Sequence, residues 1–259
     1  MPSLKDKVAV VTGSTSGIGR GIAGHFATLG AKVVITGRDG DRGAQAVEAI
    51  RHGGGEADFM RADLLVEDQC RRVIQFARER FGGLDILVNN AGDTSRGGIE
   101  SITVELWDRI MALNLRAPFI CLQEAIPLFK DRGGGSVVNI GSVNAYIGEP
   151  NLAAYSASKG GLMTLTRNAA SDLNRYRIRV NQINVGWTLT EGEDRVKRQQ
   201  EGKGPDWVEA ATATRPFGRL LTPQDVAYAA TYFASDESEC ITGSVMDLEQ
   251  YPVGAPPKW

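Results

Sequence analysis

The amino-acid sequence predicts an α/β fold, in which a doubly wound parallel sheet carries helices on both faces. Three observations lead to this expectation. Short β-branched runs alternate with helical patterns, no proline- or serine-rich linker interrupts the alternation, and 259 residues suffice to bury the core of one large domain. We therefore expect residues 1–259 to form a single domain.

The expected strands are short runs of mostly apolar residues, which are typical of strands buried on both faces of a parallel sheet. They cover Val8–Thr12, Lys32–Thr36, Leu84–Asn89, Ser136–Ile140 and Arg179–Asn184. The amphipathic stretches between them are bounded by glycine or polar residues and are expected to be helices. They cover Ile18–Leu29, Gly40–His52, Val66–Phe81 and Ala154–Tyr176.

Charge and composition exclude several classes of protein. The formal net charge of −2 gives no general attraction to nucleic acid or to an anionic membrane surface. No apolar run approaches the length of a membrane span, and the first residues hold no apolar signal segment, so we expect a cytoplasmic protein without a membrane or nucleic-acid partner. The three cysteines lack paired spacing with one another or with the two histidines, so we expect reduced thiols and no metal site.

One segment, residues 191–214, departs from the regular alternation. It is charged and helix-forming in composition, and Gly202, Gly204 and Pro205 interrupt it. Long connections in compact domains are uncommon unless they serve a function, so we interpret this segment as a substrate lid. A solvated excursion of the chain is the alternative.

A glycine-rich turn follows the first expected strand and leads directly into the first expected helix. Its residues are Thr12-Gly13-Ser14-Thr15-Ser16-Gly17-Ile18-Gly19. Glycines let the backbone turn tightly and approach a pyrophosphate, while the helix N-terminus offers free N–H groups and the positive end of its dipole. We expect a dinucleotide to be bound by Gly13, Ser16, Gly17, Ile18 and Gly19; an ordinary βα turn is the alternative.

The end of the second expected strand bears on which dinucleotide is bound. A site selective for NAD usually offers an acidic side chain to the ribose hydroxyls at this point, but Gly37 has none. Arg38 follows it and is able to pair with a ribose phosphate, so NADP(H) is favoured and NAD(H) stays open. The alternative is an arginine that faces solvent.

Tyr155 and Lys159 are four residues apart in an expected helix, which places them one turn apart on the same face. A free tyrosine is a poor base at neutral pH, and a neighbouring ammonium favours the phenolate. Ser142 follows the strand Ser136–Ile140 and so lies at the carboxyl end of the sheet, where its hydroxyl is able to hold a substrate oxygen.

Together these motifs resemble the short-chain dehydrogenase/reductase family over nearly the whole chain. Thr12–Gly19 is similar to its glycine motif, and Asn89-Asn90-Ala91-Gly92 to its fourth-strand motif. Asn114, Ser142, Tyr155 and Lys159 resemble its catalytic tetrad. The resemblance implies a Rossmann fold. It also implies that Tyr155 exchanges the hydroxyl proton and that Ser142 positions the substrate oxygen. Lys159 would lower the tyrosine pKa and bind the nicotinamide ribose, and Asn114 would hold a water that relays protons.

The resemblance also implies further cofactor contacts. Asp63 and Leu64 would border the adenine, Asn90, Ala91 and Gly92 would line the cofactor cleft, and Thr188 and Thr190 would contact the nicotinamide carboxamide. A helix cap at Asp63 and a turn at the asparagine pair are the alternatives. It implies a homotetramer in which helices such as Val104–Cys121 and Ala154–Tyr176 pair between subunits, although packing on their own sheet explains their apolar content equally.

Two departures from the family pattern stand out. The usual Asn-Pro-Gly is Asn184-Val185-Gly186 here, which leaves the local backbone less restrained. Ile241-Thr242-Gly243 matches the start of the family's last strand, but the usual Asp-Gly-Gly after it is replaced by Glu249-Gln250-Tyr251. We therefore expect the tail to Trp259 to follow its own course, across a subunit interface in one interpretation.

The inferred reaction is hydride transfer between a nicotinamide and an alcohol/carbonyl pair, coupled to proton exchange with Tyr155. The loops expected near the nicotinamide offer Asp93, Arg96, Asn144, Asn151, Trp187 and Glu191. This mostly polar set favours a sugar, sugar acid or polyol, bound by Ser142, Asn144, Tyr155, Trp187 and Arg96. A 3-oxoacyl-carrier-protein reductase, which would show a basic docking patch, and a noncatalytic dinucleotide-binding regulator are the alternatives.

Overall fold

A computed structural model describes residues 3–254 and confirms the α/β fold, with one seven-stranded parallel sheet in the order β3-β2-β1-β4-β5-β6-β7. The strands are β1 Val8–Val11, β2 Lys32–Gly37, β3 Glu56–Arg61, β4 Ile86–Asn89, β5 Gly135–Ser142, β6 Ile178–Val185 and β7 Val245–Leu248. The strand order reverses between β1 and β4, which creates a crevice at their carboxyl ends.

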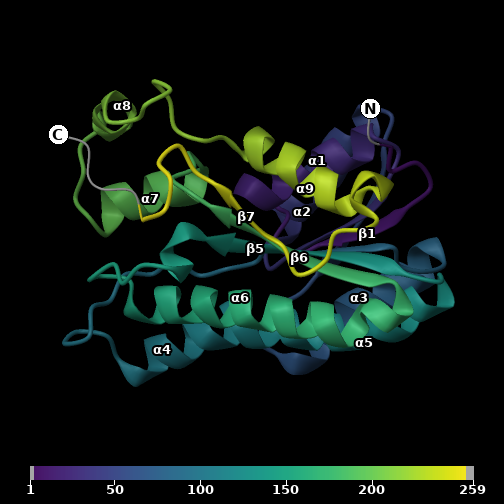
Figure 1. The fold of residues 1–259 in the computed structure, drawn as a ribbon. Coiled ribbons are helices and arrows are strands. Elements are labelled where there is room, and N and C mark those ends of the chain that lie inside the picture. The colour runs from purple at the N-terminus through teal and green to yellow at the C-terminus, as the bar shows by residue number, and fades with distance from the viewer. Residues whose placement is uncertain (1–2, 255–259) are drawn as a thin grey trace.

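Helices cover both faces of the sheet (Figure 1). One layer holds α1 Gly17–Thr28, α2 Gly40–His52 and α9 Pro223–Ala234; the other holds α3 Glu67–Phe81, α4 Val104–Met111, α5 Ala117–Asp131 and α6 Ala153–Leu173. Each layer closes its own apolar core against the sheet, one around Phe26 and Phe233 and the other around Phe129 and Ile74. None of the helices within residues 3–254 is long and apolar enough to cross a membrane.

Strand β3 was not predicted from the sequence, and β7 begins later than expected. Strand β3 reads Glu-Ala-Asp-Phe-Met-Arg and lies at the edge of the sheet, so only part of it is buried and its sequence lacks a continuous apolar run. The segment Ile241–Gly243 precedes β7 instead of beginning it, because Gly243 turns the chain with φ +74°. Residues 255–259 of the expected tail lie outside the described residues.

Several helix boundaries also differ from expectation. The stretch Val104–Cys121 is the start of a longer run, in which α4 passes through a π-helical turn at Ala112–Arg116 into α5. The helix expected over Ala154–Tyr176 ends as α6 at Leu173, and a 3₁₀ turn follows it. Residues 191–214 form two short helices, α7 Glu191–Gln199 and α8 Trp207–Ala213.

Candidate active site

A cleft of about 740 Å³ opens at the carboxyl ends of β4, β5 and β6. Eleven of the residues predicted to act in binding or catalysis line it: Ile18, Asn90, Gly92, Arg96, Ser142, Asn144, Tyr155, Lys159, Trp187, Thr188 and Thr190. They come from positions more than 170 residues apart in the chain (Ile18 to Thr190), so the fold itself assembles this group. Gly13, Ser16, Gly17, Gly19 and Ala91 belong to the adjoining glycine turn and its neighbour strand.

The glycine turn packs tightly against the end of β4. A Cβ atom on Gly13, whose φ is +63°, would lie 2.9 Å from the Cα of Ala91. A Cβ atom on Gly19 would collide with the Asn90 amide. Only glycine fits these two positions, which brings the backbone of the turn to the floor of the crevice.

The glycine turn is joined to β4 by hydrogen bonds. The Thr12 hydroxyl accepts from the backbone N–H groups of Asn90 (2.9 Å) and Ala91 (3.0 Å). In return, the Asn90 amide donates to the Thr12 carbonyl (2.8 Å) and the Gly13 carbonyl (3.2 Å). This mutual pairing holds the two sides of the crevice at one spacing.

The first turn of α1 is suited to an anion. Its N-cap residue, Ser16, makes no side-chain capping hydrogen bond, and the first turn carries no acidic residue. The N–H groups at this end therefore remain available, and the helix dipole favours negative charge there. Together with the close-packed glycines, this arrangement fits the pyrophosphate of a dinucleotide.

Two arginines lie side by side at the ends of β2 and β3. Gly37 pairs in register with Arg61, and the Arg61 guanidinium donates to the Arg38 carbonyl (2.9 Å). Both side chains are exposed, and neither has an ion pair within the described part of the chain. Asp39, the acidic residue that follows Arg38 in the sequence, caps α2 through the N–H of Arg42 (3.1 Å) and is engaged there. Arg61 could not be found from the sequence because β3 was missed.

Asp63 and Leu64 follow β3 at the same edge of the sheet. The Asp63 carboxylate accepts from the N–H of Leu65 (3.1 Å), and its own N–H donates to Gln69 (2.6 Å). Leu64 is buried in the core beneath α3. Asp63 therefore has a structural role in this turn, whatever it contacts in a bound dinucleotide.

Tyr155 and Lys159 lie one turn apart on α6, as their spacing predicts, and face Ser142 at the end of β5. The Lys159 ammonium is buried, donates to the Ile140 carbonyl (2.8 Å) and lies 5.7 Å from the centre of the Tyr155 ring. Burial lowers the pKa of Lys159 to about 8. Burial also raises the pKa of the Tyr155 phenol, while a hydrogen bond with Ser142 lowers it. The pKa of the Tyr155 phenol is therefore above its ordinary value, and the expected lowering by Lys159 does not contribute to it.

Asn114 sits behind these groups, fully buried in the π-helical turn. Its amide donates to the Asp93 carbonyl (3.0 Å) and the Ser158 hydroxyl (3.1 Å), and its oxygen accepts from the Asp93 N–H (2.8 Å). The side chain therefore ties the loop after β4 to α6. Widened helical turns of this kind recur at functional sites.

The segment 191–214 forms one wall of the cleft. Thr190 caps α7 through the N–H of Glu193 (3.0 Å) and lies against Gly17, and Thr188 is buried next to Trp187. Trp187 stacks on Trp207 of α8, with ring centres 6.1 Å apart, and donates to Glu193 (2.8 Å). Helix α7 is therefore fastened to the nicotinamide end of the expected cofactor site.

The loop after β4 reaches across to α7 through Arg96. Its guanidinium pairs with Glu201 (3.0 Å), which also accepts from Lys197 (2.7 Å), and all three side chains are less than a fifth exposed. Arg96, expected to contact substrate, is thus already paired. Arg215 and Glu249 also line the cleft and were not predicted to do so, because they approach it from the loops before α9 and after β7.

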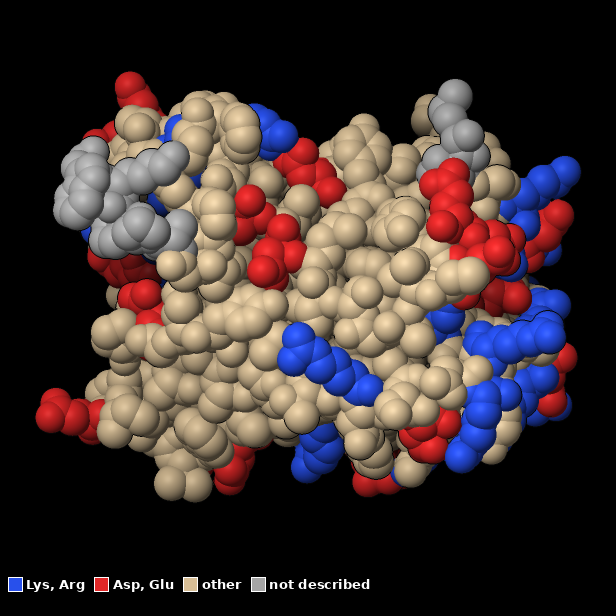
Figure 2. Space-filling view, viewed as in Figure 1, with Lys and Arg blue, Asp and Glu red and all other residues tan. Residues whose placement is uncertain are grey.

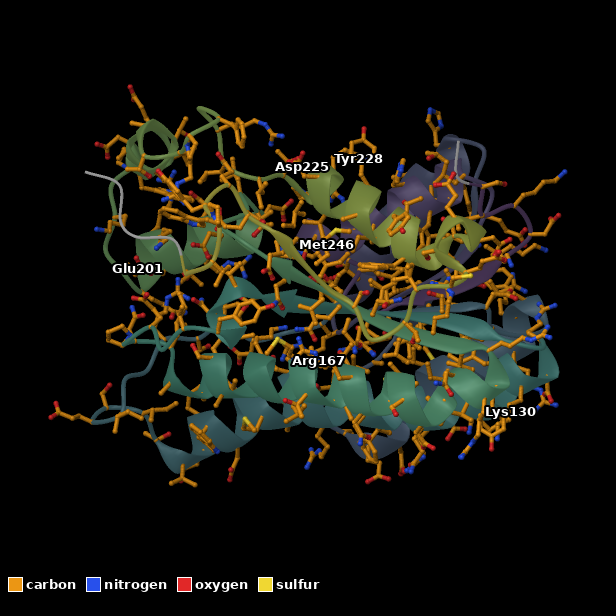
Figure 3. All side chains as sticks on the ribbon, viewed as in Figure 1. Lys130, Arg167, Glu201, Asp225, Tyr228 and Met246 are labelled. Carbon is orange, nitrogen blue, oxygen red and sulfur yellow. The ribbon has the colours of Figure 1, made fainter. Side chains whose placement is uncertain are left out.

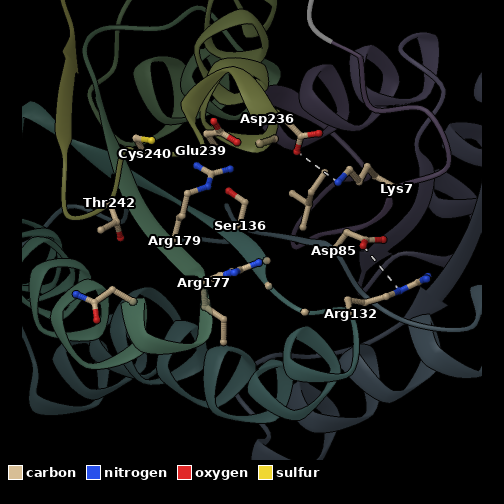
Figure 4. A pocket seen from close by; sticks show the side chains of 17 residues that line it. Lys7, Asp85, Arg132, Ser136, Arg177, Arg179, Asp236, Glu239, Cys240 and Thr242 are labelled. Atoms are coloured by element: carbon tan, nitrogen blue, oxygen red, sulfur yellow. Dashed lines mark hydrogen bonds and ion pairs between the residues drawn. The ribbon is translucent and has the colours of Figure 1, made fainter.

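A second cavity, of about 590 Å³, lies at the opposite, amino ends of β4, β5 and β6 (Figure 4). Its charged groups largely neutralise one another: Lys7 pairs with Asp236 (3.4 Å) and Arg132 with Asp85 (3.8 Å). Arg179 donates to the Ser238 hydroxyl (2.7 Å). None of the residues predicted to act in binding or catalysis lines this cavity.

Comparison with known proteins matches this chain over nearly its full length. Residues 13–249 match the family model described as enoyl-(acyl carrier protein) reductase. An NADP-dependent (R)-specific alcohol dehydrogenase of Lentilactobacillus kefiri is 37% identical, over 93% of this chain and 94% of its own. A protein of Agrobacterium tumefaciens provisionally named a gluconate dehydrogenase superposes with a TM-score of 0.90 at 30% identity, covering 98% of both chains. A 7α-hydroxysteroid dehydrogenase bound to NADH has a TM-score of 0.90 at 32% identity, over 98% of this chain and 96% of its own.

The buried ammonium of Lys159 predicts a pH-dependent cost in stability. Its pKa is about 8 in the folded protein against 10.5 for an ordinary lysine, a difference of about 3 kcal/mol. The destabilisation is fully present below pH 8. Above pH 8 the folded protein loses the Lys159 proton before the unfolded chain does, so the destabilisation shrinks as the pH rises and is gone near pH 10.5. We expect Lys159→Met to raise the free energy of unfolding at pH 6.5 by about 1–3 kcal/mol and the two proteins to converge near pH 10.

Urea unfolding of the ligand-free protein at the two pH values measures this difference. The exposed lysine variant Lys203→Met is the control and should show the same small effect at both. If the difference in unfolding free energy between Lys159→Met and the original protein is the same at both pH values, the assigned cost of burying the ammonium is wrong.

Proposed function

Because the chain belongs to the short-chain dehydrogenase/reductase family and is an oxidoreductase acting on CH–OH groups, we propose that it is an NADP(H)-dependent dehydrogenase for a secondary hydroxyl of a sugar, sugar acid or polyol. The observation that carries the proposal is the cleft itself. It places the Tyr155–Lys159–Ser142 group beside a glycine cradle with an open helix N-terminus, and lines the remaining space with polar side chains.

In the proposed mechanism Ser142 and Tyr155 hold the substrate oxygen between their hydroxyl groups, and Tyr155 takes the hydroxyl proton during oxidation or returns it during reduction. The nicotinamide dinucleotide, when bound, supplies the hydride acceptor or donor. The glycine turn, with Ser16 and Ile18, would hold its pyrophosphate, and Asn90, Ala91, Gly92, Thr188 and Thr190 would border its nicotinamide half. Asn114 holds the loop that carries these contacts and is the proposed site of a relaying water.

Lys159 is suited to two tasks in this mechanism. With a pKa of about 8 it remains mostly protonated at neutral pH, so its charge favours the phenolate of Tyr155. The ammonium has donors besides the one that bonds to Ile140, and these are available to ribose hydroxyls. Removing Lys159 should therefore impair both proton transfer and cofactor binding.

The preference for NADP(H) over NAD(H) rests on the arginine pair at the ends of β2 and β3. Arg38 and Arg61 offer two cations where Gly37 offers no side chain and Asp39 is engaged as a helix cap. Two guanidinium groups at one edge suit a ribose phosphate. The named relatives include one that is NADP-dependent and one bound to NADH, so family membership alone leaves this choice open.

A 3-oxoacyl-carrier-protein reductase is the second candidate; the matching family model is named for a different reaction on the same carrier protein, the reduction of an enoyl group. A carrier protein would need a basic docking patch beside the cleft. Arg96 and Lys197 line the cleft, but both are paired with Glu193 and Glu201, so these two cations do not form a basic patch. Polar walls and neutralised cations favour a small polyhydroxylated substrate instead.

We also propose that residues 191–214 act as the substrate lid, and that the protein is a cytoplasmic homotetramer. Exposed aromatic side chains on α5 and α9 support the assembly: Phe119, Tyr228 and Tyr232 are 45%, 60% and 36% exposed. Figure 3 shows Tyr228 pointing outward from α9, and Figure 2 shows that the middle of this face carries few charged groups apart from one basic side chain. An apolar surface of this kind favours association.

Replacing Tyr155 with phenylalanine tests the proposed chemistry. Loss of the phenol removes the proton acceptor, so kcat should fall about 100-fold or more, while the dissociation constant of the dinucleotide stays within about twofold. Turnover is followed by nicotinamide absorbance with a panel of sugars, sugar acids, polyols and apolar alcohols. Tyr176→Phe, in the 3₁₀ turn after α6 and outside the cleft, is the matched control. A Tyr155→Phe protein of near-normal rate would refute the role of the phenol.

Replacing the two arginines tests the cofactor preference. We expect Arg38→Ala to raise the KM for NADP+ about tenfold and Arg61→Ala to raise it by a smaller factor. The KM for NAD+ should change little, because these arginines pair with the ribose phosphate and NAD+ lacks it. Arg72→Ala, an exposed arginine on α3, is the control. Equal losses with both dinucleotides would instead assign these arginines a structural role.

A further inference from the structure

Four of the eight charged residues that line the cleft neutralise one another. Arg96 and Lys197 are paired with Glu193 and Glu201 across the mouth, and Glu201 bonds to both cations. Figure 3 labels Glu201 at the end of α7, where this network closes. These four side chains are less than a fifth exposed and are held by each other, so they have little left to offer a substrate.

Arg215 is different. Its guanidinium lies over two aromatic rings, 5.4 Å from the centre of Trp187 and 5.1 Å from that of Tyr251. Its Nε donates to the Thr214 hydroxyl (3.1 Å), and no ion pair joins it to a carboxylate within residues 3–254. Its two terminal amino groups make no hydrogen bond within the same residues, so they are available to a ligand.

The segment after β7 holds Arg215 in this position. The Tyr251 hydroxyl donates to the Thr214 carbonyl (2.7 Å), and the Gln250 amide bonds to the Phe217 N–H (3.1 Å) and the Arg219 carbonyl (2.6 Å). Gln250 and Tyr251 stand where the family pattern has two glycines, which have no side chains for such contacts. The departure at the C-terminus therefore fastens the loop that carries Arg215 over the cleft.

Glu249 complements Arg215 from the same segment. It lines the cleft with its carboxylate against Gly186, where even a Cβ atom would collide with it, and one oxygen accepts from the Gln250 N–H (2.5 Å). A carboxylate only accepts hydrogen bonds, so it suits the hydroxyl groups of a substrate and repels an acid. The cleft thus offers one cationic contact and one contact for hydroxyl donors.

We propose that Arg215 binds the carboxylate of the substrate and thereby selects sugar acids, among the polyhydroxylated compounds, as the substrates of this enzyme. The proposal rests on the dehydrogenase function proposed above and deepens it. The free edge of the guanidinium matches the two oxygens of a carboxylate, and Trp187 and Tyr251 keep it oriented before substrate arrives. Neutral polyols lack the group that Arg215 recognises.

Gluconate and glucitol provide the test, because they share a hydroxylated carbon chain and differ at the carboxylate. We expect the original protein to oxidise gluconate with the higher kcat/KM, and Arg215→Gln to raise the KM for gluconate about 10- to 100-fold with kcat changed less than about threefold. Its KM for glucitol and for the dinucleotide should stay within about twofold. Arg215→Lys should retain part of the preference, and the exposed Arg175→Gln variant should retain all of it.

A binding measurement separates this proposal from the dehydrogenase function. Calorimetry of gluconate with the protein loaded with the reduced dinucleotide needs no turnover; binding should weaken with added salt and with Arg215→Gln, as expected of an ion pair. Gluconate 6-phosphate is included to show whether a phosphate is bound in preference. Oxidation of gluconate and glucitol with equal efficiency, or gluconate binding that is unaffected by Arg215→Gln, would overturn the role of Arg215 and leave the dehydrogenase function intact. Turnover of apolar alcohols alone would instead contradict the proposed substrate class.

Discussion

The pairing between Thr12 and Asn90 is the constraint on which the rest of the site depends. Strands β1 and β4 are neighbours, but their chains leave the sheet in opposite directions, and a crevice opens between them. The Thr12 hydroxyl closes the base of that crevice by accepting two backbone N–H groups that would otherwise lack a partner. Leaving one such donor unpaired costs about 1–3 kcal/mol, so this one hydroxyl both stabilises the junction and sets the spacing of the cofactor cradle.

A second constraint positions the catalytic helix. A continuous chain of hydrogen bonds runs from β4 through β5 and α6 to β6 and ends at the exposed Asp247 carboxylate on β7. Its buried members are the amide and hydroxyl groups of Asn89, Asn139, Thr166, Gln182 and Asn184. Thr166 lies three turns after Tyr155 on α6 and bonds to partners on two strands. The rotation of α6 on the sheet is therefore fixed by polar contacts of defined geometry, where apolar packing alone would tolerate small rotations.

The features that could be predicted from the sequence are those that depend on a local pattern of residues. Alternating buried strands and amphipathic helices, the glycine turn and the Tyr155–Lys159 spacing are all written within short windows of the chain. The edge strand β3 escaped because half of it faces solvent, and the π-helical turn around Asn114 escaped because it leaves no mark on the hydrophobic period. The pairing of Arg96 with Glu201, 105 residues later, and the approach of Arg215 to Trp187 are tertiary, so no pattern in one segment could reveal them.

The distribution of charge explains how one cleft is both stable and selective. Charges that are paired, such as Arg96 with Glu201, hold the lid against the loop after β4 and present a neutral wall. Of the four cations that line the cleft, Lys159 and Arg215 have no carboxylate partner within the described residues, and these two face the expected cofactor and substrate. An unpaired buried cation destabilises the folded protein, as the lowered pKa of Lys159 shows. Such cations are found at sites where a bound ligand supplies the missing partner. By this reasoning the unpaired cations identify where polar and anionic groups of the ligands belong: ribose hydroxyls and a phenolate at Lys159, and a carboxylate at Arg215.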